Sequence, residues 1–139
     1  DFFLRPEQRT AVRYAQPGGN LDRERLESEI LIPISRNKAA VYRPFNCRTL
    51  SLREPVTVLP GRLNIVEGSY SFHPELARYY GLSVFLDISP ETQRSRILDR
   101  NGPEWGQQFF DRWIPLEQTY FHETDTRGRC TLALKEETR

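Results

Sequence analysis

Short apolar runs separated by turn residues divide this chain into predicted strands. Their aliphatic, β-branched and aromatic residues are bounded by Gly, Pro, Asn or charged residues, a pattern that is typical of strands. Residues 82–88 are the most continuously apolar of these runs and predict a strand that is buried on both faces. We expect strands at residues 41–45, 55–59, 63–66, 82–88 and 130–134.

Segments with helical spacing alternate with these runs. Leu26 and Ile30 lie one helical turn apart, acids occupy the preceding turn, and either Asn20 or Asp22 can cap the helix. Pro33 should end it, because proline disfavours a helical residue before it. We expect helices at residues 21–31, 74–80, 90–100 and 107–124, with a break at residues 101–103 and a kink at Pro115 in the last helix.

This alternation of strands and helices predicts an α/β fold with a parallel sheet and right-handed crossovers. With 139 residues, the chain has the length of a single domain, which we expect to cover residues 1–139. The two runs within residues 40–60 depart from the alternation, because a polar stretch joins them directly. They predict an irregular hairpin with prolines on edge strands, projecting from the domain as an accessory lid.

Composition narrows the class of protein. The chain is 37% hydrophobic and 28% charged, which fits a folded, soluble protein, and no apolar run is long enough to span a membrane. Cys47 and Cys130 lie far apart without the spacing of metal ligands, so we expect neither a disulfide nor a zinc site, and a cytoplasmic location. The net charge of +1 makes broad nucleic-acid binding an unfavoured function. The sequence leaves open whether the protein forms a homo-oligomer.

Three groups of residues have the chemistry to handle a phosphorylated ligand. Glu67 and Gly68 follow the strand expected at residues 63–66, where a carboxylate could meet Mg²⁺ and a polyphosphate. Arg96 and Arg100 lie four residues apart, on one face of the expected helix, and could stabilise the charge of a triphosphate. Asp1, at another expected strand end, could accept a hydroxyl proton as a general base.

Each of these groups also has an ordinary structural explanation. Glu67 could cap the next turn as an exposed acid, and Asp1 could be an exposed or capping acid. The two arginines could pair with Glu91, Asp99 or Asp111. The chain has 18 Arg and two Lys, and a GC-rich genome would account for most of those arginines.

Two common nucleotide-binding motifs are absent from these residues. A phosphate-binding loop needs Gly-Lys-Ser/Thr, whereas Lys38 follows Asn37 and Lys135 follows Leu134. The sequence contains no Gly-x-Gly-x-x-Gly either. The two histidines, at positions 73 and 122, have no nucleophilic partner at a recognisable spacing, and we expect both to be structural or surface residues.

The order of five short motifs resembles the uridine kinase and phosphoribulokinase-like family of P-loop small-molecule kinases. Asp1-Phe2-Phe3 looks like its Asp-x-Phe-Tyr/Phe segment, and Asn20-Leu21-Asp22 is similar to its Asn-Phe-Asp. Val41-Tyr42-Arg43-Pro44-Phe45 resembles the Val-Tyr-Asp-Phe of the substrate-covering hairpin. Ile65-Val66-Glu67-Gly68 looks like Phe-Glu-Gly, and residues 92–100 are similar to the lid helix. Together these motifs extend over essentially the whole chain.

The resemblance implies a three-layer α/β/α P-loop kinase fold that transfers the γ-phosphoryl group of ATP, with Mg²⁺, to a hydroxyl of a nucleoside or similar small molecule. It implies one lid at about residues 40–60 and an arginine lid at about residues 94–106. The implied roles are substrate binding by Asp22, Tyr42 and Phe3, Mg²⁺ binding by Glu67, and catalysis by Asp1, Arg96 and Arg100.

Departures from the family pattern bear on substrate and activity. The hairpin has Arg43-Pro44 where the family has Asp. The histidine that the family has shortly after it is absent, and Asn46-Cys47-Arg48 stands there. Asn101-Gly102-Pro103 stands where the family's lid has Arg-Gly. If the family segment reads Asp-Asp-Phe-Phe here, the catalytic base would come one residue before Asp1, and we expect the ATP-gripping βαβ unit to precede it as well.

Two other classes of function stay open. The chain could be a non-catalytic binding domain that keeps the kinase scaffold without the ATP chemistry, since a fold does not fix a function. A nucleic-acid-binding module is a weaker alternative, because it would require the arginines to form one patch.

Overall fold

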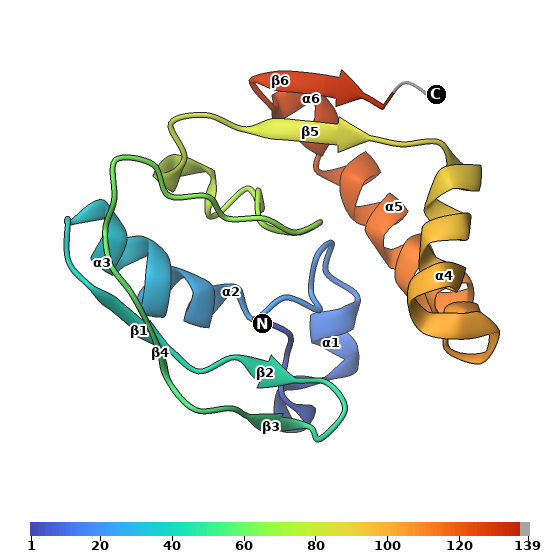
Figure 1. Cartoon of the computed structure of the whole chain (residues 1–139), viewed down its shortest axis with the longest axis horizontal. Coiled ribbons are helices and arrows are strands. Elements are labelled where there is room, and N and C mark those ends of the chain that lie inside the picture. The colour runs from blue at the N-terminus through green and yellow to red at the C-terminus, as the bar shows by residue number, and fades with distance from the viewer. Residues whose placement is uncertain (137–139) are drawn as a thin grey trace. The chain divides into compact units, whose positions relative to one another are not determined.

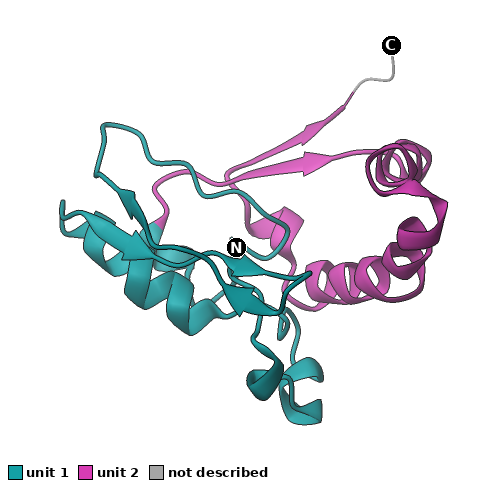
Figure 2. Cartoon of the chain, turned by 60° about the horizontal axis from the view of Figure 1, so that its bottom comes forward, with its two compact units in different colours: residues 1–79 teal, residues 80–139 magenta. Residues whose placement is uncertain are grey.

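The computed structural model describes residues 1–136 and contains both helices and short two-stranded sheets (Figure 1). Its residues fall into two compact units, Asp1–Tyr79 and Tyr80–Arg139 (Figure 2). Within the described residues, the strands form two antiparallel pairs and one parallel pair. The predicted mixed α/β class is therefore confirmed, while the predicted sheet is represented by one parallel pair.

The first unit opens with an extended segment that is held by the loop before the second helix. Phe3 forms an antiparallel bridge with Leu21, and the Leu4 N–H donates to the Asn20 carbonyl. Between them lie the 3₁₀ helix η1 (Pro6–Gln8) and the short helix α1 (Ala11–Tyr14). Leu4 and Leu21 are buried, so this antiparallel contact anchors the start of the unit in its core.

The second helical segment is longer than predicted. It consists of α2 (Arg23–Arg25), the π-helical η2 (Leu26–Leu31) and α3 (Ile32–Ser35), and Asp22 is the N-cap. The prediction that Pro33 ends the helix is wrong. In the wide π turn the Ile32 N–H donates to the Glu27 carbonyl five residues back. This wider spacing accommodates a proline, which has no N–H and crowds the preceding turn of an α-helix.

The predicted irregular hairpin is confirmed. Strand β1 (Ala40–Tyr42) pairs antiparallel with β4 (Val56–Val58), and β2 (Phe45–Asn46) pairs antiparallel with β3 (Ser51–Leu52). The two ladders are separate because Pro44 follows Arg43 on one side and Pro55 follows Glu54 on the other, and proline cannot donate to a ladder. The buried residues Ala40 and Phe45 attach the hairpin to the unit.

The connection from the hairpin to the second unit contains less regular structure than predicted. Residues 63–66 form no strand, and both Leu63 and Ile65 are exposed, so that prediction is wrong. Apolar side chains alone do not make a strand, which needs a hydrogen-bonded neighbour, and no described segment pairs with this one. The helix expected at 74–80 is reduced to turns and the 3₁₀ helix η3 (Ala77–Tyr79).

The second unit is a strand–helix–strand unit. Strand β5 (Val84–Asp87) runs parallel to β6 (Leu132–Lys135), with Val84 opposite Leu132 and Asp87 opposite Lys135. The chain between them forms α4 (Pro90–Gln108), the π-helical η4 (Phe109–Trp113), α5 (Ile114–Glu123) and α6 (Thr126–Arg129). Phe85 packs edge-to-face on Phe121 of α5, with 5.1 Å between ring centroids, and so joins the sheet to the helices.

Two interruptions in these helices follow from sequence. Ser89 caps α4, its hydroxyl accepting from the Thr92 N–H, and Pro90 begins the helix, as predicted. Gly102 has a φ of 74°, which breaks α4 at the predicted place, although helix resumes there and not at residue 107. The π turn η4 directly precedes Pro115, the same arrangement that precedes Pro33.

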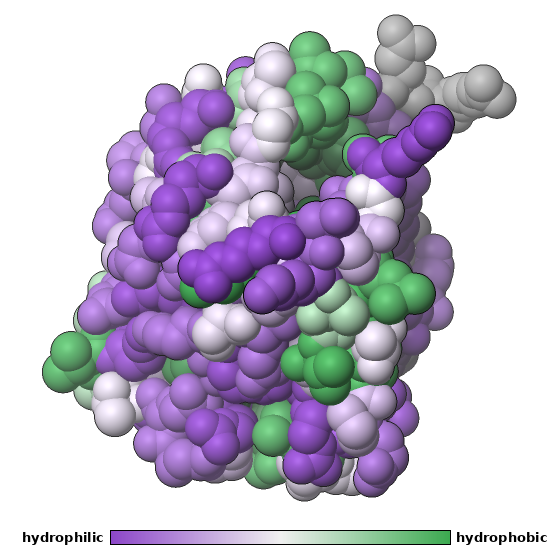
Figure 3. All heavy atoms as spheres, turned by 90° about the vertical axis from the view of Figure 1, so that its left-hand side faces the viewer, coloured by the Kyte–Doolittle hydropathy of each residue, from purple (hydrophilic) through white to green (hydrophobic). Residues whose placement is uncertain are grey.

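One face of the parallel pair is apolar and exposed. The prediction that residues 82–88 are buried on both faces is wrong, because the burial alternates along β5. Leu86 is 72% exposed, and its neighbours Leu82, Val84, Leu132 and Leu134 are exposed too. In Figure 3 hydrophobic side chains gather at the top, where Figure 1 places β5 and β6. Within residues 1–136, no third strand pairs with either β5 or β6.

Each unit has buried apolar residues of its own. Those of the first unit are Leu4, Leu21, Leu26, Leu31, Ala40, Phe45, Tyr70 and Leu76, and those of the second include Ile97 and Tyr120. The first unit thus has the larger core and positions the candidate site described next. Among residues 1–136, no helix combines the length and the apolar character that crossing a bilayer requires.

Candidate functional site

The start of the chain lies between two other segments of the first unit. The Asp22 N–H donates to the Phe2 carbonyl over 2.7 Å, and the Phe45 N–H donates to the Asp1 carbonyl over 2.9 Å. These bonds bring together three regions that are far apart in sequence: the first residues, the cap of α2 and the hairpin. Because the bonds are between backbone atoms, the arrangement does not depend on surface side chains.

The predicted general base and the predicted substrate-binding tyrosine are neighbours. The Tyr42 hydroxyl donates to Asp1 Oδ2 over 3.3 Å, and the Tyr42 ring stacks on Phe2 with 5.1 Å between centroids and an interplanar angle of 23°. The Arg25 guanidinium also lies over the Phe2 ring, 5.4 Å from its centroid. Asp1 is exposed and Tyr42 half-buried, so a ligand has access to the carboxylate and to the edge of the stack.

Arg25 fixes this stack to both the helix and the hairpin. Its Nε and Nη2 each donate to the Glu29 carboxylate over 2.7 Å, and Nη2 also donates to the Arg43 carbonyl over 2.7 Å. The hydrogen bond to Glu29 raises the pKa of Arg25, against the effect of burial. A side chain with two such anchors is rigid, which preorganises the aromatic pair beside Asp1.

Asp22 lies in the same region but is fully buried. Its exposed fraction is 0%; Oδ1 accepts from the Arg25 N–H over 3.3 Å, and Oδ2 accepts from Gln8 Nε2 over 3.0 Å. The structure therefore gives this carboxylate a capping role and connects it to Gln8. Direct binding of a substrate by Asp22 stays a prediction.

The remaining predicted residues of the first unit differ in their surroundings. Phe3 is exposed beside its bridge to Leu21. Glu67 is also exposed, in a loop, since the strand expected before it does not form.

The two predicted catalytic arginines belong to the second unit. Arg96 Nη2 donates to Glu136 Oε1 over 2.7 Å, in an exposed ion pair. The Arg100 guanidinium lies over the Phe109 ring, 5.7 Å from its centroid, two residues before the break at Gly102. In the described part of the chain, none of the acids proposed as alternative partners forms an ion pair with either arginine. The pairing of Arg96 with Glu136, just after β6, was not predicted.

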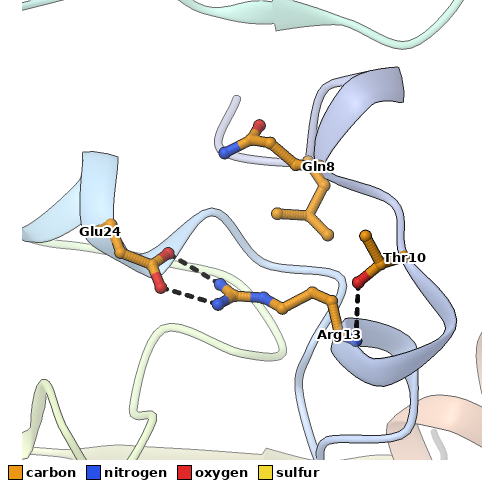
Figure 4. Close-up of a pocket in the computed structure, with 5 residues that line it drawn as sticks. Gln8, Thr10, Arg13 and Glu24 are labelled. Atoms are coloured by element: carbon orange, nitrogen blue, oxygen red, sulfur yellow. Dashed lines mark hydrogen bonds and ion pairs between the residues drawn. The ribbon is translucent and has the colours of Figure 1, made fainter.

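A pocket of about 280 Å³ lies in the first unit, and Gln8, which lines it, donates to Asp22 Oδ2. Its lining is formed by Leu4, Gln8, Thr10, Arg13 and Glu24. In Figure 4 the side chains of Arg13 and Glu24 point toward one another, with Gln8 and Thr10 nearby. Both guanidinium Nη atoms donate to the carboxylate over 2.7 Å, which raises the pKa of Arg13 and lowers that of Glu24.

Sequence reasoning did not identify this pocket. Arg13 and Glu24 are 11 residues apart, and their pairing depends on the loop that Gly19 allows. A Cβ on Gly19 would lie 1.8 Å from the Arg13 carbonyl oxygen. The Arg13 Nε also donates to the Gly19 carbonyl, and Nη2 to the Leu21 carbonyl. Neither helical nor strand spacing carries a signal for contacts made through such a loop.

The other titratable candidates have structural surroundings. His73 is buried and its pKa is lowered, chiefly by burial and also by the charge of Arg23. Cys47 and Cys130 are both free thiols. In residues 1–136, no group of three or more His, Cys, Asp or Glu side chains is arranged to hold a metal ion. No family model matches this chain, and no curated protein matches it either.

Proposed function

We propose that this chain forms the acceptor side and the arginine lid of an ATP-dependent phosphotransferase that is similar to uridine kinase. The observation that carries the proposal is the convergence of Asp1, Phe3, Asp22 and Tyr42 in one unit. These residues come from three separate segments; the resemblance implies catalysis by Asp1 and substrate binding by the other three. Phosphoryl transfer depends chiefly on positioning and charge stabilisation, which such an arrangement can supply.

The stacked pair beside Asp1 is suited to a hydroxyl-bearing ring. Phe2 and Tyr42 offer an aromatic surface, and the Tyr42 hydroxyl at 3.3 Å holds the Asp1 carboxylate in place. A hydroxyl group that approaches this carboxylate can donate its hydrogen bond to Asp1 and lose the proton there as it attacks. Asp1 therefore acts as the general base in this proposal.

The two arginines of α4 take the charge of the transferred group. They lie one helical turn apart, just before the break at Gly102, where the helix can change direction. Arg96 would have to leave Glu136, but an exposed ion pair contributes only about 0–1 kcal/mol, so the exchange is easy. A planar guanidinium is well matched to phosphate oxygens.

A magnesium ion fits the donor chemistry of Glu67. Mg²⁺ is commonly bound through one or two carboxylates, with phosphate and water oxygens completing its shell, and Glu67 is an exposed carboxylate. When bound, the ion would neutralise phosphate charge. The residues that grip the phosphates of ATP are not among these 139, which contain no Gly-Lys-Ser/Thr.

The open face of the parallel pair supports a larger sheet. Parallel strands occur almost only in sheets that are covered on both faces, whereas β5 and β6 expose Leu86 and Leu134 side by side. In the proposed three-layer P-loop kinase fold, further strands and helices would cover these side chains. We expect proteins that contain these 139 residues with such additional elements to bury both leucines.

The test is phosphoryl transfer by the protein that the complete gene encodes. We expect Mg²⁺-dependent consumption of ATP with a member of a panel of nucleosides and sugars. Glu67→Gln and Arg96→Ala should each lower kcat while leaving the fold intact. Full activity in both variants would refute the site assignment. A gene with no Gly-Lys-Ser/Thr sequence upstream, together with no turnover, would favour the non-catalytic binding domain.

The 139 residues by themselves give a separate test. Because they contain no phosphate loop, we expect this chain to show no ATP turnover while still binding the acceptor. Mg²⁺-dependent ATP consumption by this chain would contradict the proposal that these residues bind the acceptor and that other residues bind ATP. Measuring acceptor binding and ATP turnover on the same preparation separates the two halves of the proposal.

A further inference from the structure

The hairpin and the residues that flank it carry a high density of positive charge. Residues 36–62 contain five Arg and one Lys, all exposed, but a single acid, Glu54. Among residues 1–136, no ion pair includes any of these seven side chains. The net charge of +1 is thus unevenly distributed over the chain, and this stretch has a positive potential that attracts anions.

Four arginines belong to the part of the hairpin that β2, β3 and their turn form. Arg43 Nε donates to the Arg53 carbonyl over 2.7 Å, from one side of the hairpin to the other. Arg48 lies in the turn, and the Arg9 guanidinium lies over the Phe45 ring of β2, 5.7 Å from its centroid. Within the described residues, Arg9 has no carboxylate partner either. We call Arg9, Arg43, Arg48 and Arg53 the arginine patch.

The turn between β2 and β3 is held by side chains and adds a hydroxyl donor. Asn46 Oδ1 accepts from the Arg48 N–H over 2.9 Å and from the Thr49 N–H over 3.4 Å. The Thr49 and Ser51 hydroxyls bond to one another over 2.8 Å. One of these hydroxyls is the donor, so the other keeps its hydrogen for an external acceptor. Hydroxyls and guanidinium groups are both common donors to the phosphates of nucleic acids.

The shape of this region favours duplex DNA over other polyanions. Strands β2 and β3 form a two-stranded antiparallel ribbon, in which neighbouring strands lie about 5 Å apart (Figure 1). The major groove of B-form DNA, about 12 Å wide, admits such a ribbon, whereas the major groove of duplex RNA is deep and narrow.

The apolar side chains of the ribbon argue against two other partners. Phe45 is buried, so it cannot stack on the bases of a single strand. Within residues 45–52, Leu50 is the one large apolar side chain that is exposed, which is too little to anchor the turn in a lipid surface. Arginine also suits phosphate, because its planar guanidinium donates to two oxygens at once.

Nearby acids reduce the positive charge without cancelling it. Glu54 follows Arg53 directly, and Asp1 lies beside β2, since its carbonyl accepts from the Phe45 N–H. The four arginines outnumber these two carboxylates. Acids farther away than the Debye length, about 10 Å at 0.1 M salt, are largely screened.

We propose that the β2–β3 ribbon binds double-stranded DNA in the major groove, with the arginine patch contacting the phosphates. The arginines of this ribbon thereby meet the condition for nucleic-acid binding that the sequence left open, a single patch. The proposed acceptor site uses Tyr42 of β1, so the two proposals concern different parts of the hairpin and neither depends on the other.

The first experiment measures binding of the 139-residue chain to a short fluorescein-labelled DNA duplex by fluorescence anisotropy. Four phosphate contacts predict that log K falls with log salt concentration with a slope of about −3.6. Raising the salt from about 50 mM to about 200 mM should therefore weaken binding about 150-fold. Absence of binding at the lower salt concentration would overturn the proposal.

Substitutions that remove no hydrogen bond connect the binding to the patch. The side chains of Arg48 and Arg53 are exposed and donate to no other described residue, so their loss should leave the fold intact. Replacing both by alanine should reduce the slope to about −1.8, and the same rise in salt should then weaken binding about 12-fold.

Arg62→Ala is the matched control for these variants. It removes one exposed arginine of the same unit from outside the patch and should leave the slope unchanged. If Arg62→Ala reduced the slope as much as Arg48→Ala did, the binding would reflect overall charge, and the assignment to the ribbon would be wrong.

Competition distinguishes duplex DNA from other anions. At equal concentrations of negative charge, unlabelled duplex DNA should displace the labelled duplex more effectively than single-stranded DNA, duplex RNA, polyglutamate or phosphatidylserine vesicles. More effective displacement by any of these four competitors would refute the proposal that the ribbon fits a DNA groove.

Discussion

Replacing the buried carboxylate of Asp22 by Asp22→Ala tests the central connection of the first unit. The change removes the acceptor for the Arg25 N–H at the start of α2 and the acceptor for Gln8 Nε2. Loss of an N-cap costs about 1 kcal/mol, and loss of a hydrogen bond to a partly buried amide costs about another 1 kcal/mol. We therefore expect a destabilisation of ~2 kcal/mol in this unit.

Amide hydrogen exchange is the appropriate measurement, because it reports the opening of single segments. The Leu26 N–H donates to the Asp22 carbonyl over 3.1 Å and lies in the first turn of the helix. Since each ~1.36 kcal/mol is a factor of ten, a loss of ~2 kcal/mol should raise the exchange rate of this amide about 30-fold. The Phe85 N–H, in the second unit, serves as the internal reference.

A matched control removes an exposed carboxylate. Asp99→Ala, on α4, should change the exchange rates by no more than about twofold, because exposed substitutions usually stay within ±0.5 kcal/mol. If Asp22→Ala accelerated exchange no more than this control, the carboxylate would not cap the helix in solution.

Three further predictions concern backbone space, pH and the lid. A Cβ at Gly19 would lie 1.8 Å from a backbone oxygen of α1, so Gly19→Ala should lower the urea midpoint by the equivalent of ~1–3 kcal/mol, whereas Gly61→Ala, with its nearest atom at 3.4 Å, should not. Burial raises the pKa of Tyr80 to about 12. The stability that the neutral Tyr80 side chain contributes should therefore be complete below pH 10 and lost as the pH rises toward 12. Tyr80→Phe should flatten this decline in denaturation curves. Arg96→Ala breaks an exposed ion pair and should change stability by at most ~1 kcal/mol, yet, if the proposed phosphoryl transfer is found, lower its kcat about 100-fold in a coupled ATP assay. A large loss of stability with unchanged kcat would assign Arg96 a purely structural role.

Elements whose cause is local could be predicted from the sequence. The hairpin follows from apolar runs with prolines at their ends, and α4 begins where Ser89-Pro90 stands. The break at Gly102 follows from a residue that accepts a φ of 74°. In each case the residues concerned lie next to the feature they determine.

Elements that depend on a neighbour could not be predicted in this way. Residues 63–66 have the composition of a strand, but no described segment pairs with them, and they stay irregular. Pro33 would end an α-helix, but a π turn before it relieves the clash, and no simple sequence rule announces a π turn. Burial of β5 also depends on what covers it, which its own residues do not specify.

The candidate site shows the same division. The hydrogen bond of Tyr42 to Asp1 was not predicted, because 41 residues separate them and no periodic pattern connects them; the resemblance implied only a role for each in one active site. Burial of Asp22 and its bond to Gln8 were not expected, since both depend on how the first residues fold back on the cap of α2. Arg13 and Glu24 meet for the same reason.

The leucines on the open face of the parallel pair have a practical consequence for work with this chain. Exposed apolar strands with free edges associate with one another, so concentrated samples should aggregate through β5 and β6. Leu86→Lys places a charge at the most exposed of these positions and removes no core contact. Light scattering of this variant beside the natural chain would identify the source of aggregation. The variant would also be a suitable sample for measurements in solution.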